Sequence, residues 1–103
     1  MFKDKVVIVT GGASGIGRCI ADMFRSEGAY VYVIDKQAEG EHFVGDIAKK
    51  EVLEAFVEYV VARHDRVDCV INNALPLMRG IDECSYEEFQ YALSVGVTAP
   101  FYL

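Results

Sequence analysis

Hydrophobic positions along the chain follow two periods that alternate from the N-terminus onward. Residues 5–10 form a short, β-branched apolar run that ends in glycines, which is typical of a strand buried on both faces. From residue 16 the apolar positions recur at helical spacing until Gly28, a residue type that commonly ends a helix. The residues predicted to face the core from this helix are Ile16, Cys19, Ile20, Met23 and Phe24.

The same alternation continues through the rest of the chain. Residues 29–35 and 67–72 predict two further strands, residues 42–46 predict a weaker one, and a helix is predicted before residue 67. Ser85 and Glu88 have the spacing of a capping box, which opens a last helix. The predicted core-facing residues are Leu53, Phe56, Val57, Val60 and Val61 in the first of these helices, and Phe89, Ala92, Leu93 and Val97 in the second.

Alternating strands and helices predict an α/β fold, a doubly wound parallel sheet with helices on both faces and right-handed crossovers. Only residues 36–41 join the second and third strands, too few for a full helix, so a loop or single turn is expected there. Doubly wound order places the strand at 67–72 at an open apolar edge, which is an aggregation hazard when nothing covers it.

Composition narrows the function classes. The 103 residues suffice for one small domain, yet 52% are hydrophobic and the mean hydropathy is +0.19, so apolar surface is expected to be exposed or covered by something else. A net charge of −6 argues against nucleic acid as a partner.

Three cysteines at wide spacing, with no CxxC, favour reduced, mostly buried thiols in a cytoplasmic protein over a zinc site or disulfides. No signal-peptide pattern and no 18-residue apolar run occur, so no membrane is expected as a partner.

The segment at residues 10–17 joins the first strand to the first helix and has the chemistry of a phosphate site. A diphosphate at such a junction needs a tight turn, close backbone approach and free N–H groups at a helix N-terminus. Gly11, Gly15 and Gly17 meet these needs at GxxxGxG spacing, and Ser14 adds a hydroxyl. Glycines also simply make turns, but this position between a strand and a helix favours the phosphate interpretation.

Asp35 ends the second strand, 18 residues past Gly17. That is close to the offset expected for an acid that accepts hydrogen bonds from the adenosine ribose. Its carboxylate would repel a 2′-phosphate, which favours NAD over NADP, although Lys36 offers a cation nearby. The alternative for Asp35 is a solvated residue at a strand end.

With these motifs the chain resembles the short-chain dehydrogenase/reductase family over essentially all 103 residues. Residues 10–17 match the family's TGxxxGxG, residues 46–47 match its acid-plus-aliphatic pair at the adenine ring, and residues 72–74 match the start of its NNAG. The resemblance implies the N-terminal, NAD(P)-binding half of a Rossmann-type, three-layer αβα fold across residues 1–103. The cofactor-binding residues it implies are Gly11, Ala13, Ser14, Gly15, Ile16, Gly17, Asp35, Lys36, Asp46, Ile47, Asn73, Ala74 and Leu75.

Two positions depart from the family's pattern. Leu75 replaces the last glycine of NNAG and narrows the space near the ribose. Residues 93–101 resemble the family's VNxxGPF-type helix segment, and Gly96 stands where the family has its catalytic asparagine. By resemblance that asparagine acts largely through its main-chain carbonyl, and Pro100 cannot donate a hydrogen bond to the carbonyl of Gly96. We therefore hypothesise that this carbonyl is free and hydrated.

The family's catalytic serine, tyrosine and lysine lie in a later segment with a YxxxK helix. Neither Tyr86 nor Tyr91 has a lysine four residues on, so no catalytic acid is assigned within these residues. The first hypothesis is the cofactor-binding half of an NAD-dependent oxidoreductase, with NADP less favoured, that moves a hydride between nicotinamide and a carbonyl or alcohol. By resemblance its full-length form is expected to be a homodimer or homotetramer. The alternative is a non-catalytic module that binds a nucleotide or a partner chain, and the sequence does not identify a substrate.

Overall fold

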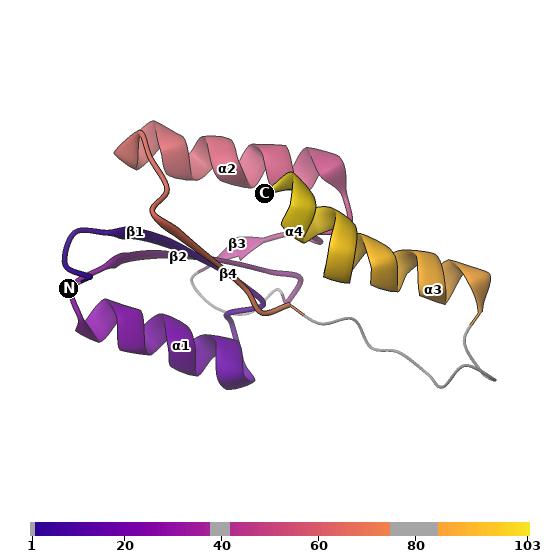
Figure 1. Ribbon diagram of the computed structural model, residues 1–103, viewed down its shortest axis with the longest axis horizontal. Helices are drawn as coiled ribbons and strands as arrows, with labels where there is room; N and C mark the ends of the chain where they lie inside the picture. Colours follow the sequence, from indigo (N-terminus) through magenta and orange to yellow (C-terminus); the bar gives the residue numbers. More distant parts are fainter. Residues whose placement is uncertain (1, 38–41, 75–84) are drawn as a thin grey trace.

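A computed structural model describes residues 2–37, 42–74 and 85–103, which form a four-stranded parallel sheet between two layers of helices (Figure 1). The strands are β1 (Val6–Thr10), β2 (Tyr30–Asp35), β3 (Phe43–Val44) and β4 (Cys69–Asn72), in the order β3-β2-β1-β4. On one face lies α1 (Gly15–Ser26); on the other lie α2 (Lys50–His64) and a continuous helical segment of α3 (Tyr86–Leu93), η1 (Ser94–Thr98) and α4 (Ala99–Tyr102). The predicted three-layer α/β fold is confirmed.

β1 is the centre of the sheet and pairs with β2 on one side and β4 on the other. Val7 lies opposite Val31 and Cys69 in these two parallel pairings. Every residue of β1 is at most 1% exposed, because α1 covers one face and α2 the other. The prediction of a strand buried on both faces is therefore confirmed for β1, and β4 lies at one edge of the sheet that the described residues form.

The sheet carries a hydrophobic core on each face. Val6, Ile8 and Ile34 pack against α2 and the last helical segment, and this cluster is completed by Ile47, Leu53, Phe56, Val60, Val95 and Ala99. The opposite cluster consists of Val7, Val9, Ala21 and Val33. Alternate side chains of each strand thus pack into opposite cores, because successive residues of a β-strand point to opposite faces of the sheet.

The predicted core face of α1 is wrong for three of its five residues. Ile16 and Met23 are 75% and 64% exposed and Cys19 is exposed, whereas Gly17 and Ala21 are buried against the sheet. The reason is that α1 begins close to the loop after β1, where only a hydrogen or a methyl group fits under the helix. Ile16, Cys19 and Met23 are turned toward solvent, whereas Phe24 packs against the core on this face of the sheet. The expectation of a buried thiol is therefore wrong for Cys19.

The predicted core face of the last helix is wrong for three of its four residues. Ala92 is buried as expected, but Phe89, Leu93 and Val97 are at least 38% exposed, and the buried residues that follow are Val95 and Ala99. Residues 94–98 form a π-helical turn in which Ala99 donates its backbone N–H to the Ser94 carbonyl. Pro100 lacks an N–H and its ring crowds the preceding turn, which favours such a wider turn just before it.

The other elements occur where the sequence pattern predicts them, but their ends differ from the predicted ones. In α2, Leu53, Phe56 and Val60 are buried as predicted, whereas Val61 is 37% exposed. β3 and β4 are shorter than predicted, at two and four residues. The predicted loop at 36–41 lies mostly outside the described residues.

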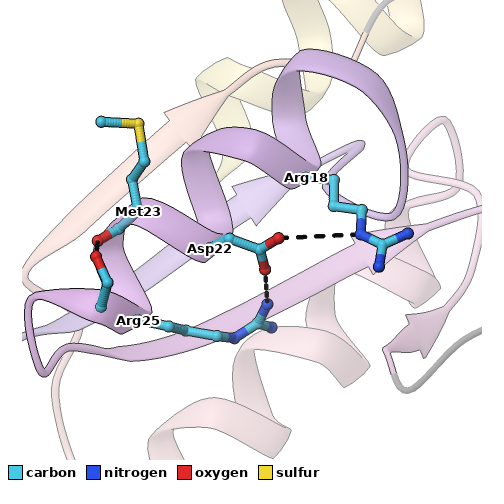
Figure 2. A network of polar contacts seen from close by, with 5 residues as sticks. Arg18, Asp22, Met23 and Arg25 are labelled. Carbon is cyan, nitrogen blue, oxygen red and sulfur yellow. Dashed lines mark hydrogen bonds and ion pairs between the residues drawn. The ribbon is translucent and has the colours of Figure 1, made fainter.

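The solvent face of α1 carries a small network of exposed charges (Figure 2). The Asp22 carboxylate lies between Arg18, at 4.0 Å, and Arg25, at 3.2 Å. All three side chains are largely exposed, so these ion pairs contribute little stability. No helix in the described part of the chain is long and apolar enough to cross a membrane.

Asp68 ties the start of β4 to the start of β1 and gives the fold a dependence on pH. Its carboxylate accepts hydrogen bonds from the backbone N–H of Val6, at 2.8 Å, and from the Arg66 guanidinium, at 3.0 Å. The Val6 N–H, and then Arg66, hold the pKa of Asp68 below its ordinary value. The stabilisation this carboxylate provides is complete above its ordinary pKa of about 4 and is lost as the pH falls through the lowered value.

We therefore expect the free energy of unfolding of the unsubstituted chain to fall more steeply below about pH 4 than that of Asp68→Asn. Urea titrations followed by circular dichroism at a series of pH values measure both slopes. Equal slopes in the two chains would contradict this role of Asp68.

Candidate cofactor site

A cavity of about 650 Å³ lies at the carboxyl ends of β1, β2 and β4. This is the edge at which doubly wound parallel sheets bind ligands, because the strand order reverses there and leaves a crevice. The cavity is lined by Gly11, Ser14, Ile16, Gly17, Ile34, Asp35, Lys36, Gln37, Gly45, Asp46, Ile47, Asn73, Ala74, Tyr91 and Val95.

The glycine loop forms one wall of the cavity and leads directly into α1. Gly11 and Gly15 have φ of +67° and +58°, a left-handed conformation that glycine adopts without a steric cost. Ser14 is the N-cap residue of α1, and its hydroxyl makes no capping hydrogen bond. The first turn of α1 contains no acidic side chain, so nothing there offsets the positive end of the helix dipole. This helix terminus can therefore receive an anion.

Gly17 is required by close packing rather than by its backbone conformation. A Cβ at this position would lie less than 3.0 Å from the Gly11 carbonyl oxygen and from Nδ2 of Asn73. A Cβ on Gly11 would likewise come within 2.9 Å of the Ala74 backbone. The two glycines let the loop after β1, the start of α1 and the end of β4 meet at one point.

Thr10 and Asn73 hold this meeting point together. The Thr10 hydroxyl oxygen accepts hydrogen bonds from the backbone N–H groups of Asn73 and Ala74, each at 3.1 Å. The Asn73 side-chain amide donates to the Gly11 carbonyl at 3.1 Å. Thr10 is 1% exposed, so its polar side chain has a purely internal role, which is to fix the glycine loop against β4.

Asp35, at the end of β2, lines the cavity and contacts the glycine loop. One carboxylate oxygen accepts the backbone N–H of Ala13 at 3.1 Å, and the other accepts the backbone N–H of Gln37 at 3.0 Å. Because each carboxylate oxygen offers two lone pairs, these bonds orient the group and leave capacity for a ligand's hydroxyl groups.

A chain of three side chains, Lys36, Tyr91 and Asp46, also lines the cavity. The Lys36 ammonium donates to the Tyr91 hydroxyl at 3.0 Å, and that hydroxyl donates to the Asp46 carboxylate, whose oxygens lie 3.1 and 3.2 Å away. Asp46 also accepts the backbone N–H of Ala48 at 3.0 Å. The bond to Tyr91 is the main reason that the pKa of Lys36 is raised above its ordinary value.

Ten of the residues predicted for the cofactor line this one cavity: Gly11, Ser14, Ile16, Gly17, Asp35, Lys36, Asp46, Ile47, Asn73 and Ala74. Ala13 and Gly15 do not line it, and Ala13 instead bonds to Asp35. Leu75 lies outside the described residues. Gly96 does not line the cavity, although its neighbour Val95 does, and a side chain at Gly96 would meet open space. The hydration of the Gly96 carbonyl stays a prediction.

The sequence pattern did not assign roles to Thr10 and Tyr91. A threonine that ends a run of fully buried valines and isoleucine needs an internal hydrogen-bond partner, which is a signal that could have drawn attention to Thr10. Tyr91 had no comparable local signal, because its partners Lys36 and Asp46 are 55 and 45 residues away in the sequence.

The cavity fits a dinucleotide in size and in chemistry. Its volume is within the range of small-molecule sites, and Gly11 and Gly17 present backbone without a side chain to one wall of it. Among the described residues no group of three or more histidine, cysteine, aspartate or glutamate side chains could hold a metal ion.

Two similar proteins, one found by its sequence and one by its structure, each match most of this chain. Momilactone A synthase from Oryza sativa subsp. japonica is 37% identical over 114 aligned positions, which cover 94% of this chain and 41% of that protein. An apo SCOR enzyme from Clostridium thermocellum superposes with a TM-score of 0.83 at 37% identity, over 95% of this chain and 45% of that one. The chain thus spans less than half the length of these two proteins.

Two further solved structures contain dinucleotides. A metagenomic short-chain oxidoreductase in complex with NADP has a TM-score of 0.87 at 26% identity, over 97% of this chain and 53% of that one. A 3-ketoacyl-(acyl-carrier-protein) reductase from Brucella melitensis complexed with NADH has a TM-score of 0.86 at 25% identity, over 98% of this chain and 47% of that one.

The family described as short chain dehydrogenase matches residues 5–103, which is nearly the whole chain and includes every element described above. With its parallel sheet, its glycine loop and its cavity at the carboxyl ends of the strands, this chain belongs to the short-chain dehydrogenase family of oxidoreductases.

Proposed function

We propose that residues 1–103 form a dinucleotide-binding unit and that its cofactor is NAD. The observation that carries the proposal is the meeting of the glycine loop, Asp35, Asp46 and Asn73 around a single cavity at the carboxyl ends of the strands. Membership of an oxidoreductase family supports an enzyme over a binding module without turnover. Because relatives include complexes with both NADP and NADH, the choice of NAD rests on Asp35.

Each part of the cavity has a distinct proposed role. The N-terminus of α1, with Ser14 and Gly17, receives the diphosphate, since its free N–H groups favour negative charge. Asp35 accepts hydrogen bonds from the adenosine ribose, and a 2′-phosphate there would be repelled. Asp46 and Ile47 hold the adenine ring, and Asn73 and Ala74 contact a ribose.

We further propose that the whole protein transfers a hydride between nicotinamide and a carbonyl or alcohol substrate. The bound nicotinamide supplies the hydride chemistry, while the residues described here bind and orient the dinucleotide. The catalytic tyrosine and lysine expected in the family are not among these residues, and the Gly96 carbonyl is the one group here proposed to take part in the proton relay.

The outer face of the last helical segment supports self-association of the whole protein. An exposed apolar stripe runs along it at helical spacing, and its members are Tyr86, Phe89, Leu93, Val97 and Phe101. Large apolar side chains exposed along one helix are typical of an interaction site. We propose that this face contributes to a homodimer or homotetramer.

Calorimetric titration of the chain with NAD tests the central proposal. We expect saturable binding of one NAD per chain, because the glycine loop, Asp35, Asp46 and Asn73 line a single cavity. A chain that is folded by circular dichroism and gives no heat of binding with either NAD or NADP would overturn the proposed cofactor site.

A further inference from the structure

Lys36 is the one cation that lines the cavity within the described residues, and its side chain is directed to the Asp46 side. Its ammonium lies 3.0 Å from the Tyr91 hydroxyl and 5.0 Å from the centre of the Tyr91 ring. Both a hydrogen bond and a cation–π contact therefore hold it against one residue.

Asp35 is the immediate sequence neighbour of Lys36, so their Cα atoms are about 3.8 Å apart. A flexible lysine stem at this point can reach whatever group the Asp35 carboxylate binds. In the part of the chain that the structure describes, however, no ion pair joins Lys36 to Asp35, and the two oxygens of Asp35 accept backbone N–H groups instead. The negative charge of Asp35 is thus not offset by its neighbour.

We propose that Tyr91 is a selectivity residue that tethers Lys36 on the Asp46 side of the cavity and so preserves the preference for NAD over NADP. The inference rests on the proposed function, because it requires the adenosine ribose to lie at Asp35. A 2′-phosphate at that position meets an uncompensated carboxylate while Lys36 is held by Tyr91. Once released, the ammonium is close enough to pair with the phosphate and reduce the repulsion.

The raised pKa of Lys36 agrees with this arrangement, since its largest cause is the hydrogen bond to the Tyr91 hydroxyl. The hydroxyl is held in turn by the Asp46 carboxylate, which accepts a hydrogen bond from it. The tether is therefore a chain of charge-assisted hydrogen bonds from the end of β2 through α3 to the residues after β3.

The test is the ratio of the dissociation constants of NADP and NAD, measured by calorimetry on one preparation of each variant. The two dinucleotides carry the same adenine, so any effect of Tyr91 on Asp46 cancels in the ratio. We expect Tyr91→Phe to lower the ratio roughly fivefold, about what one exposed charge pair contributes. Adding Lys36→Met to the Tyr91→Phe chain is expected to restore the original ratio.

The matched control is Tyr102→Phe, because Tyr102 also stacks with a lysine, Lys50 at 5.5 Å, but does not line the cavity. Its ratio is expected to equal that of the unsubstituted chain. If Tyr91→Phe leaves the ratio unchanged while NAD still binds, the proposed tethering of Lys36 by Tyr91 is wrong, and the proposed function stands. If the unsubstituted chain binds neither dinucleotide, the proposed function falls and the tether falls with it.

Discussion

Replacing Gly17 by alanine is expected to destabilise the chain by about 1–3 kcal/mol and to weaken dinucleotide binding at least roughly tenfold, as overpacking at a crowded contact does. A Cβ at this position overlaps with the Gly11 carbonyl and the Asn73 amide. Both are fixed, Gly11 by its own bond to Ile34 and Asn73 by its bond to Thr10. The added methyl group must therefore push α1 away from the end of β4. Urea unfolding and calorimetric titration with NAD measure the two effects.

Gly96→Ala is the matched control for stability, since Gly96 is also a helical glycine but has open space where the Cβ would lie. Its backbone φ is not positive, so alanine is compatible there. We expect this variant to be stabilised by about 0.5–1 kcal/mol, the usual gain when alanine replaces glycine within a helix. A Gly17→Ala chain as stable as the Gly96→Ala chain would contradict the close approach at the glycine loop.

Replacing Asp35 by alanine is expected to weaken NAD binding roughly tenfold to a hundredfold, because hydrogen bonds to a charged group are lost. The same change is expected to relax the exclusion of NADP, so that the ratio of the two dissociation constants moves toward one. Asp35 also fixes the loop through the N–H of Ala13, so part of the loss in NAD affinity reflects a looser loop. That part is common to both cofactors and does not alter the ratio.

Asp22→Ala is the control for net charge, because it removes one carboxylate from the exposed face of α1, outside the cavity (Figure 2). Its ratio of dissociation constants is expected to equal that of the unsubstituted chain. If Asp35→Ala binds NAD and NADP with unchanged relative affinity, Asp35 does not discriminate between a hydroxyl and a phosphate at the 2′ position of the adenosine ribose. The proposed preference for NAD is then contradicted.

The order of strands and helices followed from the period of the hydrophobic pattern, since a short β-branched apolar run such as residues 6–9, followed by glycines, is typical of a strand covered on both faces. The face that each helix buries did not follow in two cases. Gly17 and Ala21 are buried in α1 because the helix approaches the sheet closely, and a hydrophobicity pattern gives small residues too little weight. In the last helix a π turn at residues 94–98 precedes Pro100, and there Val95 and Ala99 are buried instead of Val97.

The candidate site was predictable where its residues are consecutive and less so where they are distant. The glycine loop and the acid at the end of β2 have fixed spacings, and these residues do meet at one cavity. The bonds from Thr10 to Asn73 and from Tyr91 to Lys36 join segments separated by 63 and 55 residues. Such contacts depend on the register and packing of whole elements. The buried run before Thr10 indicates only that its hydroxyl needs a partner, and Tyr91 has no local pattern of this kind.

The most direct test of the central claim is a map of backbone amide shifts in ¹⁵N-labelled chain during titration with NAD. We predict that the largest shifts occur at Gly11, Gly17, Ile47 and Ala74, which line the proposed cofactor cavity. A second hollow lies at the β3 edge and includes Val31 and Phe43, whose amides are expected to shift little. Shifts that centre on the β3 edge, or that are absent at saturating NAD, would contradict a dinucleotide site at the glycine loop.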